Sequence, residues 1–322
     1  MSKDTTHLIL GFTGGIGRAV ALALSKREIP TRVLVRNPQK ATKYSKGLKN
    51  LDIIAGDASK PEDLKVAFQG VDVVYYCVNV PYHQWEKHAL QLLKYCVDAA
   101  VEHKVKLIFP GNVYVYGNAK YNPVDEKHPH GAHTKKGQIR MEMEEMLALA
   151  KKDEGLDYSI IRMPDFYGPF VINTFSEQLY INALKGKTLR WIGKLDAEIE
   201  LIFIEDGGEA MVMSAVNEKS NGQIFNIPGY EITTARKYLG EIINQAGTKA
   251  SITTLNADIM YKIAGLFSPV IKEVHEMLYL KREKLILNGA KFNQLIGPLQ
   301  ETDYTTGIKK TLDWVKEFYA VN

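Results

Sequence analysis

Cysteine is scarce in this sequence. Only Cys77 and Cys96 occur among 322 residues, and they have neither the spacing of metal ligands nor the number needed for a disulfide framework. We therefore expect no metal site, and a reducing, cytoplasmic compartment suits the composition.

Long apolar runs and concentrated charge are also lacking. No stretch is apolar over the length that crosses a bilayer, and the first apolar run, residues 7–11, is too short for a signal peptide. The 41 Lys and Arg residues exceed the 37 Asp and Glu residues by only four, and they are dispersed along the chain. The sequence therefore predicts no membrane contact and no nucleic-acid partner.

What is present is a regular alternation in the first half of the chain. Apolar runs predict strands, and segments with apolar spacing near three and four predict amphipathic helices. This alternation predicts right-handed β-α-β units around a parallel sheet. The strands are expected at 8–11, 32–35, 51–55, 72–78, 106–110 and 158–162, and the helices at 16–26, 61–69, 85–103 and 135–152.

The second half is less regular. Residues 201–204 and 223–227 predict two more strands, while 257–280, interrupted near Pro269, and 307–318 predict helices. The predicted fold class is α/β, a Rossmann-type doubly wound parallel sheet with a smaller, interleaved C-terminal substrate lobe. We assign residues 1–169 to the dinucleotide-binding domain, with returning strands at about 200–228, and most of 170–322 to the smaller lobe.

A glycine-rich turn follows the first predicted strand. The sequence Gly11-Phe-Thr-Gly-Gly-Ile-Gly17 leads directly into a helix. One glycine permits the tight turn, another lets the backbone approach phosphates, and the last lets helix and strand pack closely. The helix N-terminus then faces an anion. This predicts a dinucleotide site at Gly11, Thr13, Gly14, Gly15, Ile16 and Gly17.

Further motifs follow the other strands: Gly56-Asp57, Asn79, Val115-Tyr116-Gly117, the run 165–169 (Asp-Phe-Tyr-Gly-Pro), the run 203–206 and the run 311–314. With the G-x-x-G-x-x-G spacing, they resemble the short-chain dehydrogenase/reductase superfamily, in its extended, atypical epimerase/dehydratase-like branch. The resemblance implies a nicotinamide cofactor and a small-molecule substrate. It also implies that the cofactor is bordered by Asp57, Ala58, Val78, Asn79, Pro164 and Phe166.

The end of the second strand bears on which cofactor binds. An acid at this position usually hydrogen-bonds the adenosine ribose, but here Arg36 stands there. Arg36 can pair bidentately with a 2′-phosphate, and Lys40 and Lys43 on the next helix can add charge. We therefore predict NADP. NAD is the alternative, if Arg36 merely stacks on adenine or faces solvent.

The resemblance implies a serine after the fifth strand and a Tyr-x-x-x-Lys pair on the next helix. Aligned on Val115-Tyr116-Gly117, Asn112 replaces the serine. Aligned on Glu144, Lys136 replaces the tyrosine and Arg140 the lysine, so the usual triad is replaced. We interpret the literal Tyr116-x-x-x-Lys120 as a coincidence, because Gly117 and Asn118 disfavour a helix there.

The replacing residues supply the catalytic candidates. Tyr114 lies two residues beyond Asn112, so strand alternation would point both side chains the same way. Lys136 and Arg140, two cations one helical turn apart, repel each other, and an equally open alternative is that they hold the cofactor ribose or phosphate. Tyr82, His83 and His133 are further polar residues of the expected cleft. The candidate catalytic set is Asn112, Tyr114 and Lys136.

Three functions fit the sequence. The first is an NAD(P)-dependent oxidoreductase acting on a small carbonyl or alcohol. The second is a sugar-nucleotide epimerase or dehydratase, against which Asp165 adds negative charge where relatives use asparagine. The third is a non-catalytic NADP(H)-binding redox sensor, which loss of the usual tyrosine and lysine favours.

The resemblance also implies a homodimer formed by helices 85–103 and 135–152. An apolar stripe on each helix suits this arrangement, although such stripes also cover a sheet. The stripe residues are Leu90, Leu93, Val97 and Val101 on the first helix, and Met143, Met146 and Leu147 on the second.

Overall fold

A central parallel sheet organises the structure. The computed structural model describes residues 5–172, 176–255 and 275–320. Seven strands pair in the order β3-β2-β1-β4-β5-β6-β11, and every pairing is parallel. The strands are β1 (His7–Leu10), β2 (Thr31–Val35), β3 (Leu51–Ala55), β4 (Val73–Tyr76), β5 (Lys106–Asn112), β6 (Tyr158–Met163) and β11 (Gln223–Asn226).

This strand order defines where ligands gather. The chain runs outward from β1 through β2 to β3, and then returns to place β4 on the other side of β1. Doubly wound sheets bind ligands beyond the carboxyl ends of the strands at this reversal. The predicted Rossmann-type fold class is confirmed.

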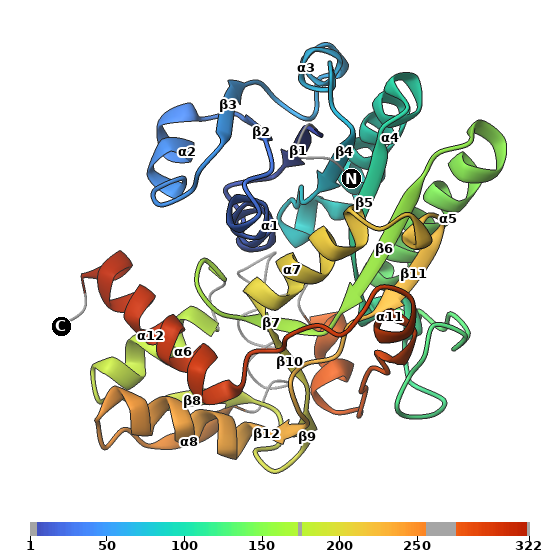
Figure 1. The fold of residues 1–322 in the computed structure, drawn as a ribbon. Coiled ribbons are helices and arrows are strands. Elements are labelled where there is room, and N and C mark those ends of the chain that lie inside the picture. The colour runs from blue at the N-terminus through green and yellow to red at the C-terminus, as the bar shows by residue number, and fades with distance from the viewer. Residues whose placement is uncertain (1–4, 173–175, 256–274, 321–322) are drawn as a thin grey trace.

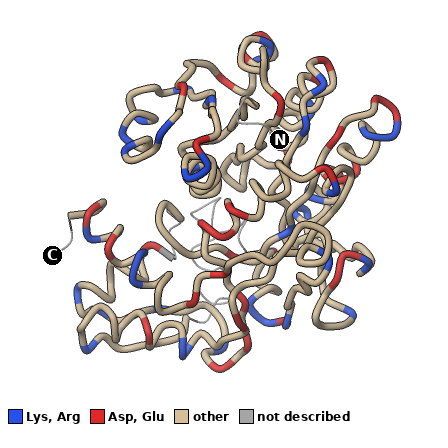
Figure 2. Tube along the Cα trace, in the orientation of Figure 1, with Lys and Arg blue, Asp and Glu red and all other residues tan. Residues whose placement is uncertain are grey.

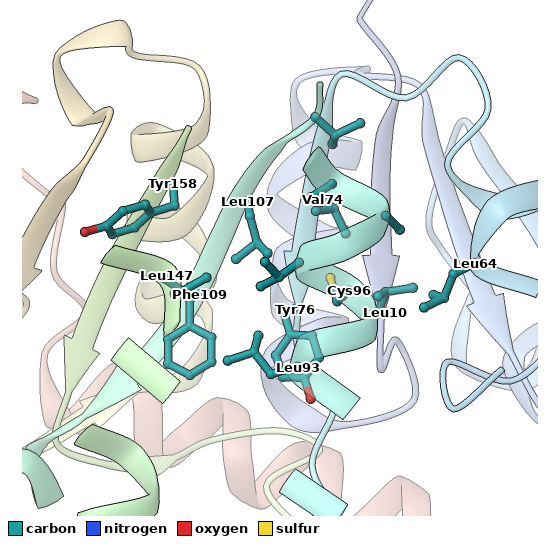
Figure 3. Close-up of a cluster of buried hydrophobic side chains, with 14 of the residues drawn as sticks. Leu10, Leu64, Val74, Tyr76, Leu93, Cys96, Leu107, Phe109, Leu147 and Tyr158 are labelled. Carbon is teal, nitrogen blue, oxygen red and sulfur yellow. The ribbon is translucent and has the colours of Figure 1, made fainter. Parts of the chain in front are cut away.

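Helices cover both faces of the sheet (Figure 1). Because side chains alternate along a strand, Leu8 and Leu10 enter one buried cluster and Ile9 enters the other. The first cluster includes Leu93 and Leu147 from two helices, and Figure 3 shows them against the sheet. Burying each such side chain contributes about 1.5 to 3 kcal/mol. The helices of this half are α1 (Gly15–Lys26), α2 (Pro38–Tyr44), α3 (Pro61–Ala67), α4 (Trp85–His103), α5 (Lys135–Glu154) and α7 (Ile204–Ala215).

The second cluster depends on close packing between α1 and α7. A Cβ added to Gly208 on α7 would lie 2.5 Å from the carbonyl carbon of Ala19 on α1. A Cβ added to Gly207 would meet Met163 Sδ at 2.9 Å. These two glycines therefore let α7 approach both the helix of the glycine turn and the sheet.

The smaller lobe has its own core, built by short strands and three helices. Tyr180, Tyr238 and Leu312 are among its buried residues. Its elements are β7 (Asp165–Tyr167), α6 (Ser176–Leu184), β8 (Leu189–Ile192), β9 (Glu198–Ile199), β10 (Leu201–Phe203), β12 (Thr233–Thr234), α8 (Ala235–Ala246), β13 (Ile252–Leu255) and α12 (Tyr304–Tyr319). The short helix α11 (Ala290–Leu295) instead packs on β11, where Phe292 joins the core of the central sheet.

Two predictions for this half need correction. The expected strand 201–204 ends at Phe203 as β10, pairs with β7 in a separate two-stranded sheet, and does not return to the central sheet, whereas β11 does. Ile204 begins α7 because its side chain and the following apolar residues pack at helical spacing. The expected helix 257–280 lies mostly outside the described residues, and its end forms the short 3₁₀ helix η4 (Glu276–Lys281).

Most residues of the two apolar stripes that were predicted to form a dimer are instead buried within the chain. Leu93, Val97, Met143 and Leu147 are buried within the chain, whereas Leu90, Val101 and Met146 are partly exposed. Because α4 and α5 pack beside each other on the sheet, most of each stripe is used there. The homodimer stays a prediction.

Charge is distributed over both lobes. Lys and Arg segments are interspersed with Asp and Glu segments along the chain (Figure 2). Of the helices that the structure describes, none is both long enough and apolar enough to cross a bilayer.

The α1–α7 contact generates a stability prediction. Gly208→Ala places a methyl group against the α1 backbone, so we expect a loss of about 1 to 3 kcal/mol in the free energy of unfolding. Gly240→Ala on α8 is the matched control because its added Cβ meets nothing within 4 Å. We expect that control to be stabilised by about 0.5 to 1 kcal/mol. Urea unfolding measures both, and equal effects would contradict the packing account.

Candidate functional site

The glycine turn is shaped by backbone contacts. Gly11 has a φ of +88°, and its added Cβ would lie 2.3 Å from the Cys77 carbonyl oxygen. An added Cβ on Gly17 would lie 2.4 Å from the Gly11 carbonyl oxygen. Gly14 is exposed at the N-cap of α1, where an added Cβ would make only an ordinary 3.4 Å contact. The first backbone N–H groups of α1 thus lie at an open edge suited to an anion.

The turn also meets the strand ends on its other side. The Phe170 carbonyl oxygen lies 3.0 Å from the position of a Cβ on Gly15. The half-buried Ile16 and Phe166 both lie near Gly207, at 3.5 Å and 3.1 Å from its added Cβ. These contacts bring the turn beside the residues that follow β6, including the buried Pro164.

Charged residues lie at the ends of β2 and β3. Arg36 and Lys40 are exposed, and the Asn37 side chain caps α2 by accepting from the Lys40 backbone N–H at 2.8 Å. Burial acts to raise the pKa of Asp57, but hydrogen bonds from Ser59 and the charge of Arg36 together lower it. The Lys40 ammonium lies 5.3 Å from the Tyr44 ring centroid. The strand ends therefore carry an exposed guanidinium beside an ionised carboxylate and the partly buried Ala58.

Lys136 is buried at the start of α5. Thr134 caps this helix by accepting from the Gly137 N–H at 3.1 Å. An added Cβ on Gly137 would lie 2.9 Å from the Tyr114 carbonyl oxygen, so this glycine lets the helix start pack against the segment that follows β5. The Lys136 side chain is 1% exposed, and its Nζ lies 2.6 Å from Glu276 Oε1 and 5.3 Å from the Tyr82 ring centroid.

Two tyrosines lie next to this lysine. The Tyr82 and Tyr114 hydroxyl groups are 2.8 Å apart and hydrogen-bonded. Burial raises the pKa of both hydroxyls, well above its usual value for Tyr114. Both hydroxyls therefore hold their protons at neutral pH. One donates to the other, and the accepting hydroxyl keeps its own proton for a further hydrogen bond.

The expected alignment of Asn112 with Tyr114 by strand alternation is wrong. β5 ends at Asn112, and residues Val113–Tyr116 form the 3₁₀ helix η2. The Asn112 side-chain oxygen caps this helix by accepting from the Tyr114 N–H at 3.1 Å. Tyr114 therefore reaches Tyr82 through helical geometry, and the Asn112 oxygen is engaged by the backbone.

Arg140 lies away from the Lys136 ion pair. Its guanidinium carbon lies 4.9 Å from the Trp85 ring centroid and 5.4 Å from that of Phe109, and Nη1 donates to the Pro110 carbonyl at 3.2 Å. The expected repulsion between the two cations is therefore offset by Glu276 on one side and aromatic rings on the other. Trp85 Nε1 also donates to the Asn79 side-chain oxygen at 3.1 Å, beside the partly buried Val78.

The negative charge of Asp165 is paired. Its Oδ2 lies 2.6 Å from the Lys281 ammonium, which lowers the pKa of Asp165. The sequence argument that this charge opposes an anionic sugar nucleotide is therefore wrong as stated, because a cation beside it balances the charge.

A buried polar network fixes α5 on β6. Arg162 and Glu144, 1% and 3% exposed, form an ion pair, and Arg162 Nη1 donates to the Tyr116 hydroxyl at 2.8 Å. That hydroxyl donates to Asn226 at 2.6 Å, while Lys120 is exposed in the following loop. Tyr116 and Lys120 thus do not form a catalytic pair. The sequence-based predictions did not include this network. The presence of an arginine within an otherwise apolar strand was the sequence feature that could have indicated it.

Sequence reasoning also missed η4. This segment places Glu276 on Lys136, and no local pattern predicts a contact between residues 140 apart in sequence. A cavity of about 330 Å³ borders Glu276, with His133, Tyr279 and Arg282 among its lining residues. Within the described ranges, no three His, Cys, Asp or Glu side chains are grouped so as to hold a metal ion.

Known proteins share this architecture. Residues 7–228 match the family model described as the NAD dependent epimerase/dehydratase family. The chain is 23% identical to a putative UDP-glucose 4-epimerase of Methanocaldococcus jannaschii, over 96% of this chain and 98% of that protein. It is 25% identical to a UDP-N-acetyl-alpha-D-glucosaminuronate decarboxylase of Bacillus cytotoxicus, over 96% and 97%.

A solved structure gives the same fold at low identity. The UDP-glucuronic acid 4-epimerase of Bacillus cereus, in complex with NAD, superposes with a TM-score of 0.81 at 18% identity, covering 98% of this chain and all of that one. The family match spans the glycine turn, all seven strands of the central sheet and the start of α5. The chain belongs to the NAD dependent epimerase/dehydratase family.

Proposed function

We propose that this protein is an NADP(H)-dependent oxidoreductase that acts on a small carbonyl or alcohol substrate beside Lys136. The observation that carries the proposal is a cluster of one ammonium and two protonated hydroxyl groups on segments that follow the strands. Lys136 lies against the Tyr82 ring, and Tyr82 is hydrogen-bonded to Tyr114. This set takes the place of the family's tyrosine and lysine.

These groups suit the reduction of a carbonyl. Negative charge develops on the substrate oxygen in that direction, and a buried ammonium stabilises it. Either Lys136 Nζ or a tyrosine hydroxyl can then deliver the proton that completes the alcohol. Because burial raises the pKa of Tyr82 and Tyr114, both carry that proton at neutral pH.

The cradle of the glycine turn fits a dinucleotide. The open N-terminus of α1 at Gly14, Gly15 and Ile16 would hold the pyrophosphate. When bound, the cofactor supplies or accepts the hydride. Arg36 and Lys40 would bind the 2′-phosphate, with Asp57 and Ala58 bordering the adenosine. Thr13, Val78, Asn79, Pro164 and Phe166 would line the remaining cofactor surface.

Sugar-nucleotide epimerase or dehydratase activity is the second candidate. The names of the two epimerases that the chain resembles favour it, and the Lys281–Asp165 ion pair removes one electrostatic objection. Such chemistry also needs a base that removes a proton from a sugar hydroxyl. Because burial keeps Tyr82 and Tyr114 protonated at neutral pH, they suit donating a proton to a carbonyl oxygen better than removing one from a sugar hydroxyl, so carbonyl reduction is the better supported function.

The pyrophosphate assignment is tested by Gly14→Val. Since an added Cβ makes only a 3.4 Å contact here, we expect the thermal unfolding midpoint to stay near that of the parent. The isopropyl group would project where the backbone must approach phosphate, so cofactor binding should be lost. Calorimetric titration measures this, and undiminished binding would refute the assignment.

Cofactor preference is tested by Arg36→Ala. A charge-assisted phosphate contact contributes about 1.5 to 3 kcal/mol, so NADPH affinity should fall roughly tenfold to a hundredfold while NADH affinity changes little. Lys46→Ala is the control, because it removes an exposed cation that follows α2. If Arg36→Ala lowered the affinity for NADPH and NADH equally, Arg36 would not be the residue that binds the 2′-phosphate.

The role of Lys136 is tested by Lys136→Met, assayed as NADPH oxidation with a panel of small aldehydes and ketones. Loss of the proton donor should lower kcat/KM by about a hundredfold to ten-thousandfold. The control is Lys135→Met, which removes the neighbouring exposed ammonium paired with Glu86. A parent protein that binds NADPH but oxidises it with no carbonyl compound would contradict the proposal and favour the sensor.

A further inference from the structure

The segment η4 lies directly on the first turn of α5. Glu276 Oε2 accepts from the Lys135 backbone N–H at 2.9 Å, and Oε1 accepts from Lys136 Nζ at 2.6 Å. The Lys136 backbone N–H lies 3.4 Å from Oε1. A carboxylate near a helix N-terminus is further stabilised by the helix dipole. Glu276 is thus held by one side chain and by the backbone of α5.

This contact covers the group that the proposed function requires. The Lys136 side chain is 1% exposed and that of Glu276, which contacts its ammonium, is 23% exposed, so the carboxylate is the solvent-facing partner of this pair. An ammonium paired in this way is not free to bind a substrate oxygen. The site is therefore masked by the protein's own carboxylate.

The other end of η4 is also held by an ion pair. Lys281 Nζ lies 2.6 Å from Asp165 Oδ2 and 5.5 Å from the Trp191 ring centroid. Asp165 begins β7, directly after the strand end that borders the candidate site. Both ends of this six-residue segment are therefore tied by charge to residues of the site.

There is space for Glu276 to leave Lys136. The cavity of about 330 Å³ borders Glu276 and includes His133 and Arg282 in its lining. Arg282 and His133 are both exposed, and Arg282 can attract an anion entering from solvent. The same cavity can admit a small ligand to Glu276, whose carboxylate contacts the masked ammonium.

We propose that Glu276 is an autoinhibitory group, and that a small ligand bearing a carboxylate relieves it by taking the place of the Glu276 carboxylate at the α5 N-terminus, which lets Lys136 Nζ contact the reacting oxygen of that ligand. The inference deepens the proposed function by naming organic carboxylates as the substrate class. It places Glu276 in competition with the substrate and gives it no part in proton transfer.

The mask is tested by the reactivity of Lys136 in the folded, full-length protein. A small amine-acetylating reagent is added, and acetylation of Lys136 and Lys135 is followed by peptide mass spectrometry. In Glu276→Ala we expect Lys136 to react about tenfold faster or more, because the reagent no longer waits for the ion pair to open. The exposed Lys135 should react at an unchanged rate.

Two variants control for the loss of charge and for folding. Glu283→Ala removes a carboxylate from the same cavity lining and should leave Lys136 reactivity at the parent rate. Glu276→Gln keeps the size of the side chain and an acceptor for the Lys135 N–H, and should give an intermediate rate. This second variant carries the test if Glu276→Ala fails to show cooperative thermal unfolding.

The ligand class is tested by chemical rescue. Sodium propionate added to Glu276→Ala should slow Lys136 acetylation toward the parent rate, whereas sodium chloride at equal ionic strength should not. Parent-like Lys136 reactivity in both Glu276 variants would overturn the mask, and failure of propionate to protect would overturn the carboxylate class. Because no readout involves turnover, either failure is distinct from failure of the oxidoreductase proposal.

Discussion

The structure around the candidate site depends on keeping one ammonium out of water. Lys136 is almost wholly buried at the start of a helix, where an unpaired positive charge would be costly. The helix N-terminus adds to that cost because its dipole also favours negative charge. Glu276 lowers both costs, because its carboxylate contacts the ammonium and accepts a hydrogen bond from the backbone N–H of Lys135. A segment distant in sequence is thereby tied to the end of the sheet that carries the candidate site.

The same burial determines the protonation of the neighbouring groups. Tyr82 and Tyr114 lie beside the ammonium, and burial raises the pKa of both hydroxyls. The cluster therefore offers protons and positive charge to a ligand, while the carboxylates near it are already paired with Lys136 and Lys281. This arrangement leaves both hydroxyls protonated at neutral pH and the Lys136 ammonium balanced by a carboxylate. It also explains why a group that brings its own negative charge is the natural competitor for Glu276.

Local patterns in the sequence predicted the central sheet because its strands are mostly apolar runs separated by amphipathic helices. They did not predict β9 or β12, which are only two residues long and have no measurable alternation. The glycine turn was predictable because the backbone requires glycine at two of its positions: Gly11 has a positive φ, and Gly17 lies too close to the Gly11 carbonyl for a Cβ. The end of β5 was not predictable, because the Asn112 side chain caps a 3₁₀ helix that begins at the next residue. The Glu276–Lys136 contact depends on tertiary folding alone, and no spacing along the chain indicates it.

The central claim is that Lys136 serves the substrate rather than the cofactor, and a crystal structure with bound NADP⁺ tests it most directly. The account predicts the adenosine 2′-phosphate at Arg36 and the pyrophosphate at the N-terminus of α1. It predicts that Lys136 Nζ lies toward the space in front of the nicotinamide C4 atom, together with the Tyr82 and Tyr114 hydroxyls. A structure in which Lys136 Nζ instead hydrogen-bonds the cofactor ribose or a phosphate would contradict it.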